Sequence, residues 1–165
     1  MEVRTAGPGD RPWMEACCRR AFVGPVVASL GRVIDPAVLP ALVAWEGPHR
    51  VGALAYQEEP GGAEVVLLVA DPPGRGAGSA LLAALRAEGL RRKWDRLRLL
   101  TTNDNLAALG FYQRRGWDLV RLHRGAVDRD RLLKPAIPAV GVRGIPIRHA
   151  LDLELRLAPR EGEGP

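Results

Sequence analysis

The chain has 165 residues, of which 47% are hydrophobic, enough for one domain with a substantial core. Its formal net charge is +5, but the basic residues are spread over several predicted elements without interleaved aromatic residues, which argues against a nucleic-acid-binding protein. No apolar run is long enough to span a bilayer, and residues 1–5 lack the basic-then-apolar pattern of a signal peptide. We therefore expect a cytoplasmic protein without membrane contact.

The two cysteines, Cys17 and Cys18, are adjacent, and adjacent cysteines on a helix point in different directions and do not suit a structural disulfide. The three histidines, His49, His123 and His149, are scattered along the sequence. Neither a zinc site nor a Cys–His nucleophile pair is indicated. We expect packed or partly exposed thiols and no metal.

The N-terminal part of the sequence predicts a strand over residues 2–5 and a helix over residues 13–22. Asp10 is expected to cap this helix, with Pro12 in its first turn. A second helical piece is predicted over residues 25–32.

A strand-rich part follows. Residues 38–45 and 51–57 predict two strands joined by a hairpin turn, and residues 63–70 predict the central strand. After it the pattern predicts, in order, an Ala- and Leu-rich helix over residues 76–93, a strand over 96–101, a helix over 105–115 capped by Asn103 or Asp104, and a strand over 117–123.

The last part begins with an irregular segment, residues 124–146, with a possible short helix over 128–134. Residues 151–157 alternate Leu with charged residues and predict the clearest strand of the chain. This strand could pair within the chain or with a second copy, so a homodimer is possible. We expect residues 1–158 to form a single domain and residues 159–165 to be a disordered tail.

A glycine-rich turn follows the predicted central strand and leads directly into the Ala- and Leu-rich helix. It contains Gly74, Gly76 and Gly78. Glycine lets a ligand approach the main chain closely, and the free N–H groups at a helix start form an anion site. The segment therefore predicts a cradle for a phosphate or pyrophosphate group.

Three interpretations of this turn compete. A P-loop closes on Gly-Lys-Ser/Thr, but Gly78 is followed by Ser79 and Ala80 without a lysine. A Rossmann dinucleotide site needs Gly-x-Gly-x-x-Gly, and the last glycine here has the wrong spacing. The third interpretation is a strand-to-helix turn that binds no ligand.

A second motif decides between them. Asn105, Ala108 and Tyr112 follow the spacing N-x-x-A-x-x-x-Y, and a Gly-Trp pair comes four residues later. Together with Gly76 and Gly78, this pattern resembles the GNAT superfamily of acyl-CoA-dependent N-acyltransferases, whose pyrophosphate loop is Q/R-x-x-G-x-G/A. The segment resembles most a little-described bacterial subgroup. Pro73 departs from the family, which has Gln or Arg there, so we expect cofactor affinity to be lower.

The resemblance implies an α/β fold with a mixed, twisted sheet of about six or seven strands and helices on both faces. In that fold, strands 63–70 and 96–101 splay apart and acyl-CoA lies in the gap. The implied activity is direct transfer of the acetyl group of acetyl-CoA to a primary amine of a small molecule or peptide, through a ternary complex without an enzyme nucleophile. The alternative on the same fold is a non-catalytic acyl-CoA-binding sensor.

The resemblance also implies roles for individual residues. Tyr112 would protonate or hydrogen-bond the leaving thiolate, and Glu64 would act as general base directly or through water. The alternatives are a half-buried core tyrosine and a solvated carboxylate at a strand end. Cofactor contacts are expected from the glycine turn and the elements beside it: Leu68, Val69, Gly74, Arg75, Gly76, Ala77, Gly78, Ser79, Asn103 and Asn105. For both asparagines the alternative role is helix capping.

The amine site is expected between the first helices, the loop before Glu64 and residues 124–146. Trp13, Trp45 and His49 are candidates for its lining, although core packing is favoured for both tryptophans. The sequence does not identify the amine.

Overall fold

The computed structural model describes residues 1–157. Its strands are β1 (Glu2–Thr5), β2 (Val27–Ser29), β3 (Arg32–Ile34), β4 (Ala41–Glu46), β5 (His49–Glu59), β6 (Gly62–Ala70), β7 (Arg96–Thr102), β8 (Asp118–His123) and β9 (Ala150–Arg156). Its α-helices are α1 (Arg11–Phe22), α2 (Ala77–Arg91), α3 (Leu106–Gln113) and α4 (Ala126–Leu133), with single 3-10 turns at Pro8–Asp10, Pro36–Val38 and Val142–Gly144. In this part of the chain no helix is long and apolar enough to cross a membrane.

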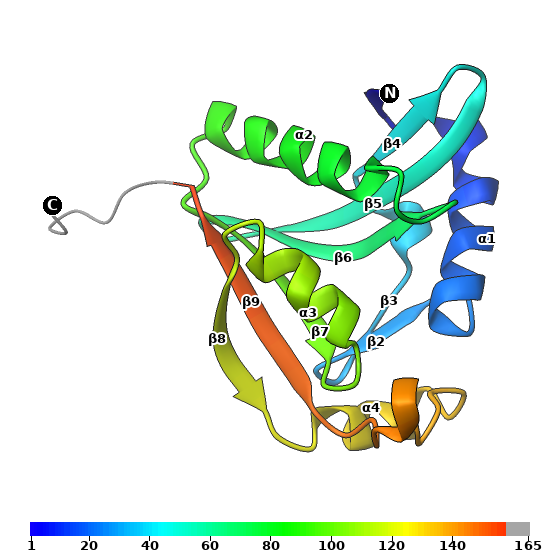
Figure 1. The fold of residues 1–165 in the computed structure, drawn as a ribbon, viewed down its shortest axis with the longest axis vertical. Coiled ribbons are helices and arrows are strands. Elements are labelled where there is room, and N and C mark those ends of the chain that lie inside the picture. The colour runs from blue at the N-terminus through cyan, green and yellow to red at the C-terminus, as the bar shows by residue number, and fades with distance from the viewer. Residues whose placement is uncertain (158–165) are drawn as a thin grey trace, which may run out of the picture.

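Seven strands form one twisted sheet in the order β1-β4-β5-β6-β7-β9-β8, and β2 and β3 form a separate hairpin (Figure 1). All neighbours in the sheet are antiparallel except β6 and β7, which are parallel. Helix α2 connects these two parallel strands, as a parallel pair requires a crossover. The mixed sheet expected from the sequence is confirmed.

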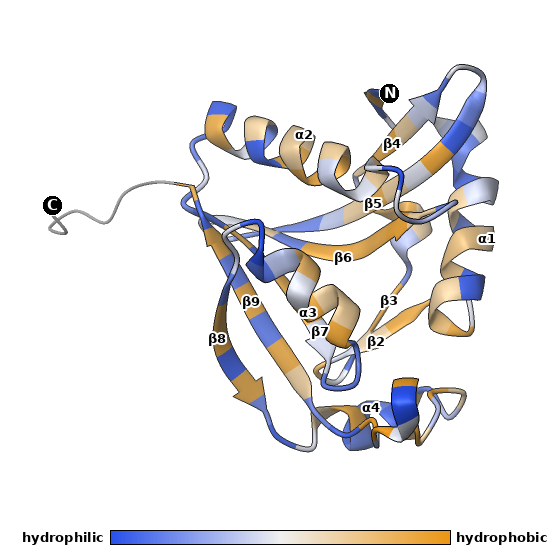
Figure 2. Cartoon of the chain, viewed as in Figure 1, coloured by the Kyte–Doolittle hydropathy of each residue, from blue (hydrophilic) through white to orange (hydrophobic). Residues whose placement is uncertain are grey.

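Helices cover both faces of the sheet. On one face, α2 and α3 pack on the larger core, in which Leu81 and Leu85 meet Leu97 and Leu153. On the other face, α1 covers the half of the sheet that contains β4, β5 and β6, and it buries Met14 and Cys18. Figure 2 shows a mostly apolar β6 and, on each of these helices, polar and apolar residues together.

On the face that α1 covers, the strands β7 and β9 are covered by α4 and the segment after it instead. These elements form a third, smaller core, in which Val127 and Ile147 pack with Ala150. The first two cores therefore hold the sheet between helices, while the third closes one end of it (Figure 1).

A β-bulge divides β6 into two halves. Tyr56 of β5 pairs with Val65 and Ala55 pairs with Leu67, so Val66 is an extra residue on β6. Because side chains alternate along a strand, one extra residue reverses the alternation. Val65 and Leu68 consequently both join the core under α2 and α3, while Leu67 joins the core under α1.

The strands β6 and β7 separate at this bulge. They pair only from Gly62–Arg96 to Val65–Leu99, although β6 continues to Ala70 and β7 to Thr102. The increased local twist at a bulge is the physical reason for the divergence. The splay between strands 63–70 and 96–101 that the resemblance implied is present.

Most predicted elements are confirmed, and the local predictions that differ are these. Residues 25–32, predicted as helical, hold β2, the hairpin turn and the first residue of β3. Asp10 occupies the N-cap position of α1, as predicted, but its side chain makes no capping hydrogen bond, because its carboxylate accepts from the Gly7 N–H and pairs with Arg50. The cap of α3 is neither Asn103 nor Asp104 but Asn105, whose side chain accepts from the Ala108 N–H at 3.1 Å.

The strand predicted over residues 151–157 is β9, and it lies inside the sheet between β7 and β8 rather than at an edge. It is therefore paired on both sides within the chain, and a homodimer through this strand is not open to it. The expected disordered tail, residues 159–165, lies outside the described residues.

Candidate active site

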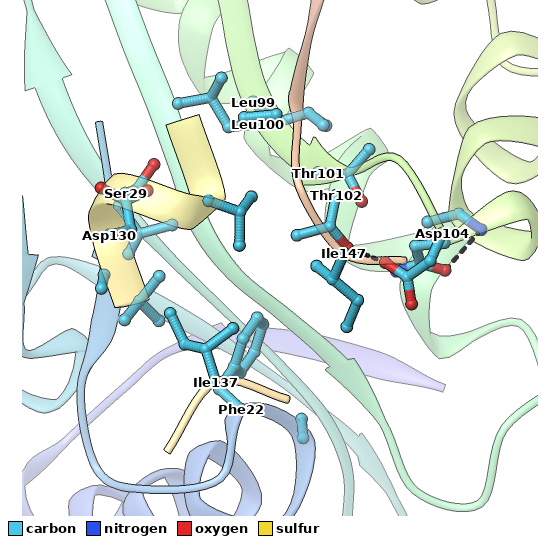
Figure 3. A pocket seen from close by; sticks show the side chains of 18 of the residues that line it. Phe22, Ser29, Leu99, Leu100, Thr101, Thr102, Asp104, Asp130, Ile137 and Ile147 are labelled. Atoms are coloured by element: carbon cyan, nitrogen blue, oxygen red, sulfur yellow. Dashed lines mark hydrogen bonds between the residues drawn. The ribbon is translucent and has the colours of Figure 1, made fainter. Parts of the chain in front are cut away.

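A cavity of about 510 Å³ opens where β6 and β7 separate. Residues of both strands line it, and the end of α1, the β2–β3 hairpin, α3 with its N-cap residue and the segment from α4 to β9 form the remaining walls. Figure 3 shows side chains from these elements facing one another across it, with Thr101 and Thr102 of β7 opposite Ser29 and Asp130. The splay of the sheet is thus enclosed by segments that are far apart in the sequence.

One wall of the cavity is an open strand edge. From Leu67 to Ala70, β6 pairs with β5 on one side and, among residues 1–157, with no strand on the other. Among the predicted cofactor residues, Leu68 lines the cavity and Val69 faces the core under α1. An open edge offers backbone N–H and C=O groups to an extended ligand, as in β-strand addition.

The glycine turn leads from this edge into α2. Gly74 and Gly76 have φ of +82° and +88°, and Gly76 is the N-cap residue of the helix. A side chain at either position would be strained, so glycine is required by the backbone. The first N–H groups of α2, around Ala77, have no helical carbonyl before them to bond, and a helix start of this kind favours an anion.

Gly78 has a different role. A Cβ atom at this position would lie 3.2 Å from the Phe111 ring, so the missing side chain lets α3 approach α2 closely. The close approach also places Arg115, just after α3, over Phe111 with its guanidinium 3.6 Å from the ring centroid. Arg115 donates to the Ser79 hydroxyl at 2.7 Å. The positively charged guanidinium of Arg115 therefore lies beside the start of α2, where a bound anion would be close to it.

Arg115 lies beside the glycine turn, a position that the sequence reasoning missed. The sequence places it only near a helix end, and nothing in its spacing indicates that α3 folds against the first turn of α2. The predicted residue Arg75 is also at the turn, but its guanidinium pairs with Glu46 at 3.1 Å and is largely exposed.

Tyr112 lines the cavity and is nearly buried. Its ring makes an edge contact with Phe111 and a tilted contact with Trp117 at centroid distances of 5.2 and 5.6 Å. Burial raises the pKa of the Tyr112 phenol to about 12, because the phenolate is poorly solvated there. Tyr112 therefore lies at the cavity, as the resemblance implied, and it also packs in the core, which was the alternative interpretation.

Glu64 also lines the cavity, and its side chain is only 4% exposed. Both carboxylate oxygens accept hydrogen bonds from Arg32 of β3, at 3.0 and 2.9 Å. Arg98 lies 3.8 Å from the same carboxylate. The solvated strand-end alternative is therefore wrong, because Glu64 is a buried carboxylate held by arginine.

The two asparagines differ. Asn105 caps α3 and lines the cavity, so it has the capping role and a position near the cofactor gap. The Asn103 amide is engaged elsewhere: it donates to the Pro146 carbonyl and accepts from the N–H groups of Arg148 and His149. Its side chain fastens the segment before β9, and it is outside the cavity lining.

The amine site was expected to include three further side chains, those of Trp13, Trp45 and His49. Trp13 and Trp45 pack against the core under α1, as favoured, and His49 is exposed at the β4–β5 turn. None of the three lines the cavity. The expected contributions from the first helix and from the segment after residue 124 are present, whereas the β2–β3 hairpin takes the place of the loop before Glu64.

Residues 13–117 match the family model of the Acetyltransferase (GNAT) family. The match covers more than half of the chain, so the chain belongs to the GNAT acetyltransferase family. It includes β6, the glycine turn and the Asn105–Tyr112 motif.

The chain is also similar to individual proteins. Bacillus subtilis YxbD is 40% identical over 103 residues and B. subtilis YdhI is 36% identical over 103 residues, and each match spans 62% of this chain. The matches span 65% of YxbD and 64% of YdhI, less than two thirds of either relative. A GNAT family acetyltransferase of Elizabethkingia anophelis, crystallised with acetyl-CoA bound, superposes with a TM-score of 0.74 over 94% of this chain and 97% of that one, at 12% identity. This likeness shows that the fold is shared.

Proposed function

We propose that the protein is an N-acetyltransferase that moves the acetyl group of acetyl-CoA directly to a primary amine in a ternary complex. The observation that carries the proposal is the open β6 edge, which runs from the anion site at the start of α2 to the cavity that contains Tyr112 and Glu64. The acetyl-CoA in the E. anophelis protein and the family membership support the choice of cosubstrate.

In this proposal the pyrophosphate binds the N–H groups from Gly74 to Ser79, with Arg115 as the nearby cation. The pantetheine arm lies along the free edge of β6 at Leu68 and Val69, and Asn105 lies beside it. We do not assign Asn103 to the cofactor, because its amide is already bonded to residues 146–149.

The chemistry needs no covalent enzyme intermediate. The ammonium loses a proton to Glu64 or to a water bound to it, and the nitrogen lone pair then forms the C–N bond to the thioester carbonyl. When the C–S bond breaks, the electron pair leaves with sulfur. The thiolate gains one proton and the nitrogen releases one, so the products are the N-acetyl amine and CoA.

Tyr112 has the role of hydrogen-bond donor to the departing sulfur. With a pKa of about 12, the phenol stays neutral at physiological pH and keeps its O–H available. Full transfer of its proton to a thiolate, whose ordinary pKa is about 8.5, would be uphill by roughly 5 kcal/mol. The proton from the nitrogen therefore completes the thiol, and Tyr112 stabilises the charge while it develops.

The first test is calorimetric titration of the protein with acetyl-CoA, followed by release of CoA in the presence of primary amines. Gly76→Glu places a carboxylate at the anion site and is expected to abolish binding. Gly144→Glu is the matched control, since Gly144 also has a positive φ and open space around it. Tyr112→Phe is expected to keep binding and to lower kcat by about tenfold to a thousandfold.

The outcomes separate the alternatives. A wild-type protein that does not bind acetyl-CoA would show that the glycine turn is structural and would refute the proposal. Binding without transfer to any amine would favour the acyl-CoA sensor, for which the engagement of Glu64 by Arg32 is the favouring observation. The cytoplasmic location and a homodimer remain predictions.

A further inference from the structure

The walls of the cavity beyond β6 and β7 are predominantly apolar. Phe22 comes from the end of α1, Val27 from the hairpin, Val127 from α4, and Ile137 and Ile147 from the segment that follows. In Figure 3, Phe22, Ile137 and Ile147 lie around the same opening. A ligand placed here exchanges water for hydrocarbon contacts over most of its surface.

Three charged side chains also reach the cavity, and the protein itself satisfies each of them. The Asp130 carboxylate, 2% exposed, accepts from the N–H groups of Leu30 and Gly31 at 3.0 and 2.7 Å. Lys134 donates to the carbonyls of Phe22 and Val26.

Asp104 is the third of these side chains. It accepts from the Thr102 hydroxyl at 2.5 Å and from the Val142 N–H at 3.3 Å. Each of these groups is already satisfied within the protein, so none of them requires a ligand to compensate its burial.

Glu64 differs from these groups in the kind of partner it has. Its oxygens are held by the Arg32 side chain, which is 41% exposed and can rotate into solvent without breaking any backbone hydrogen bond. An ammonium group can therefore replace the Arg32 guanidinium at this carboxylate. Within residues 1–157, this is the one anionic position of the cavity wall held only by side chains.

From this distribution of charge we infer that the acceptor is a small primary monoamine with an apolar body, such as an arylalkylamine or an alkylamine. The inference rests on the proposed acetyltransferase function. The ammonium binds at Glu64 and the body packs on Phe22, Val27 and Ile147. The volume of about 510 Å³ also has to hold the acetyl end of the cosubstrate, which leaves room for a small molecule. The further charge of a polyamine or an amino acid would lie against the apolar wall or beside a group that the protein already satisfies.

The test compares kcat/KM for phenethylamine and hexylamine with that for spermidine, ethanolamine, glycine and an Ala-initiated peptide, with CoA release as the signal. Binding of acetyl-CoA is measured separately, so failure of the proposed function is distinguished from failure of this inference. We expect the apolar monoamines to exceed the others at least tenfold, a factor of the order that one unpaired buried polar group produces. Preference for spermidine, glycine or the peptide, or acetyl-CoA binding without acetylation of the apolar amines, would overturn the inference.

A pair of variants on the same hairpin locates the effect. Val27 lines the cavity, whereas Val33 on the partner strand is 54% exposed and outside the lining. We expect Val27→Asp to lower kcat/KM for phenethylamine at least about tenfold and to raise the relative rate with spermidine, because it adds an unpaired carboxylate to the wall. Val33→Asp should change neither. Acetyl-CoA affinity equal to wild type verifies that Val27→Asp is folded, and the milder Val27→Asn serves if it is not. Equal effects of the two aspartates would contradict the assignment.

Discussion

Tyr112 is both a core residue and part of the cavity wall. Its ring contacts Phe111 and Trp117, and the residue lines the cavity, where in the proposed reaction its hydroxyl would donate to the departing sulfur. Only burial raises its pKa, since no charged group is among the causes of the shift. The Tyr112 phenol therefore stays neutral, and its O–H stays a donor, over the whole physiological pH range because of packing alone.

The raised pKa of Tyr112 predicts a specific pH dependence of stability. The native phenol ionises at about pH 12, whereas a tyrosine in the unfolded chain ionises at about pH 10. The resulting stability is fully present below pH 10 and is lost as the pH rises toward 12. At pH 11 the wild type should have lost about 1.4 kcal/mol that Tyr112→Phe does not lose.

Urea unfolding of both proteins at pH 8 and pH 11 measures this difference. The comparison between the two proteins cancels the other groups that titrate in this range. Parallel decreases in the free energy of unfolding would show that Tyr112 ionises normally in the native state.

The cysteines provide a second prediction at the residue scale. Cys17 and Cys18 are unpaired and buried, at 3% and 1% exposure, and burial raises the pKa of both thiols. Because the thiolate is the reactive form, both should react with Ellman's reagent far more slowly than free cysteine at pH 8. In guanidinium chloride, which unfolds the protein, both thiols should react immediately. Rapid reaction of the native protein would indicate that α1 detaches from the sheet.

At the scale of elements, α4 fixes the β2–β3 hairpin. The two residues of the hairpin turn, Leu30 and Gly31, have φ of +50° and +77°, as a two-residue type I′ turn requires. Leucine is unfavourable in this conformation. The Asp130 carboxylate compensates by accepting both N–H groups of the turn. An element far along the chain therefore holds a wall of the cavity.

Asp130→Asn tests this clamp, with Asp128→Asn as the matched control on the same helix. Asp130 is buried and bonded to backbone N–H groups, so its loss should decrease the free energy of unfolding by about 2–3 kcal/mol. Asp128 is 40% exposed and pairs with Arg131 and Arg148, so its replacement should change stability far less than that of Asp130. Urea unfolding measures both, and hydrogen exchange of the Leu30 and Gly31 amides should accelerate only in Asp130→Asn. Equal effects would contradict the clamp.

At the scale of the molecule, the sheet has two parts that meet along a short seam. β6 and β7 pair over only four residues each, Gly62–Val65 with Arg96–Leu99, and separate beyond them. A ligand in the gap would contact both parts. Acetyl-CoA bound there should consequently stabilise the whole fold and not only the glycine turn.

A thermal shift measurement tests this coupling. Acetyl-CoA at a hundredfold excess over its Kd should add about 2.7 kcal/mol to the free energy of unfolding, because it binds only the folded state. For a chain of this size that corresponds to a rise in Tm of roughly 5–10 °C. Gly76→Glu should show no rise and Gly144→Glu the full rise. A wild-type Tm unaffected by acetyl-CoA would contradict binding in the gap.

Much of this organisation follows from the sequence. The order of strands and helices after residue 38, the glycine turn and the Asn105–Tyr112 spacing are local patterns, and they placed Tyr112 and Glu64 at one cavity. The β2–β3 hairpin was missed because its turn contains Leu30 where an Asn or Gly signal would be expected, and the stabilising group, Asp130, is a hundred residues away.

The sequence by itself determined the family, the glycine turn and the residue types of the site, because backbone conformation at Gly76 and motif spacing are local properties. Only the tertiary structure decided which partners those residues have: Arg32 at Glu64, Arg115 at Ser79, and the 146–149 segment at Asn103. The physical reason is that burial and ion pairing depend on side chains brought together from distant segments. No local pattern along the chain specifies such contacts.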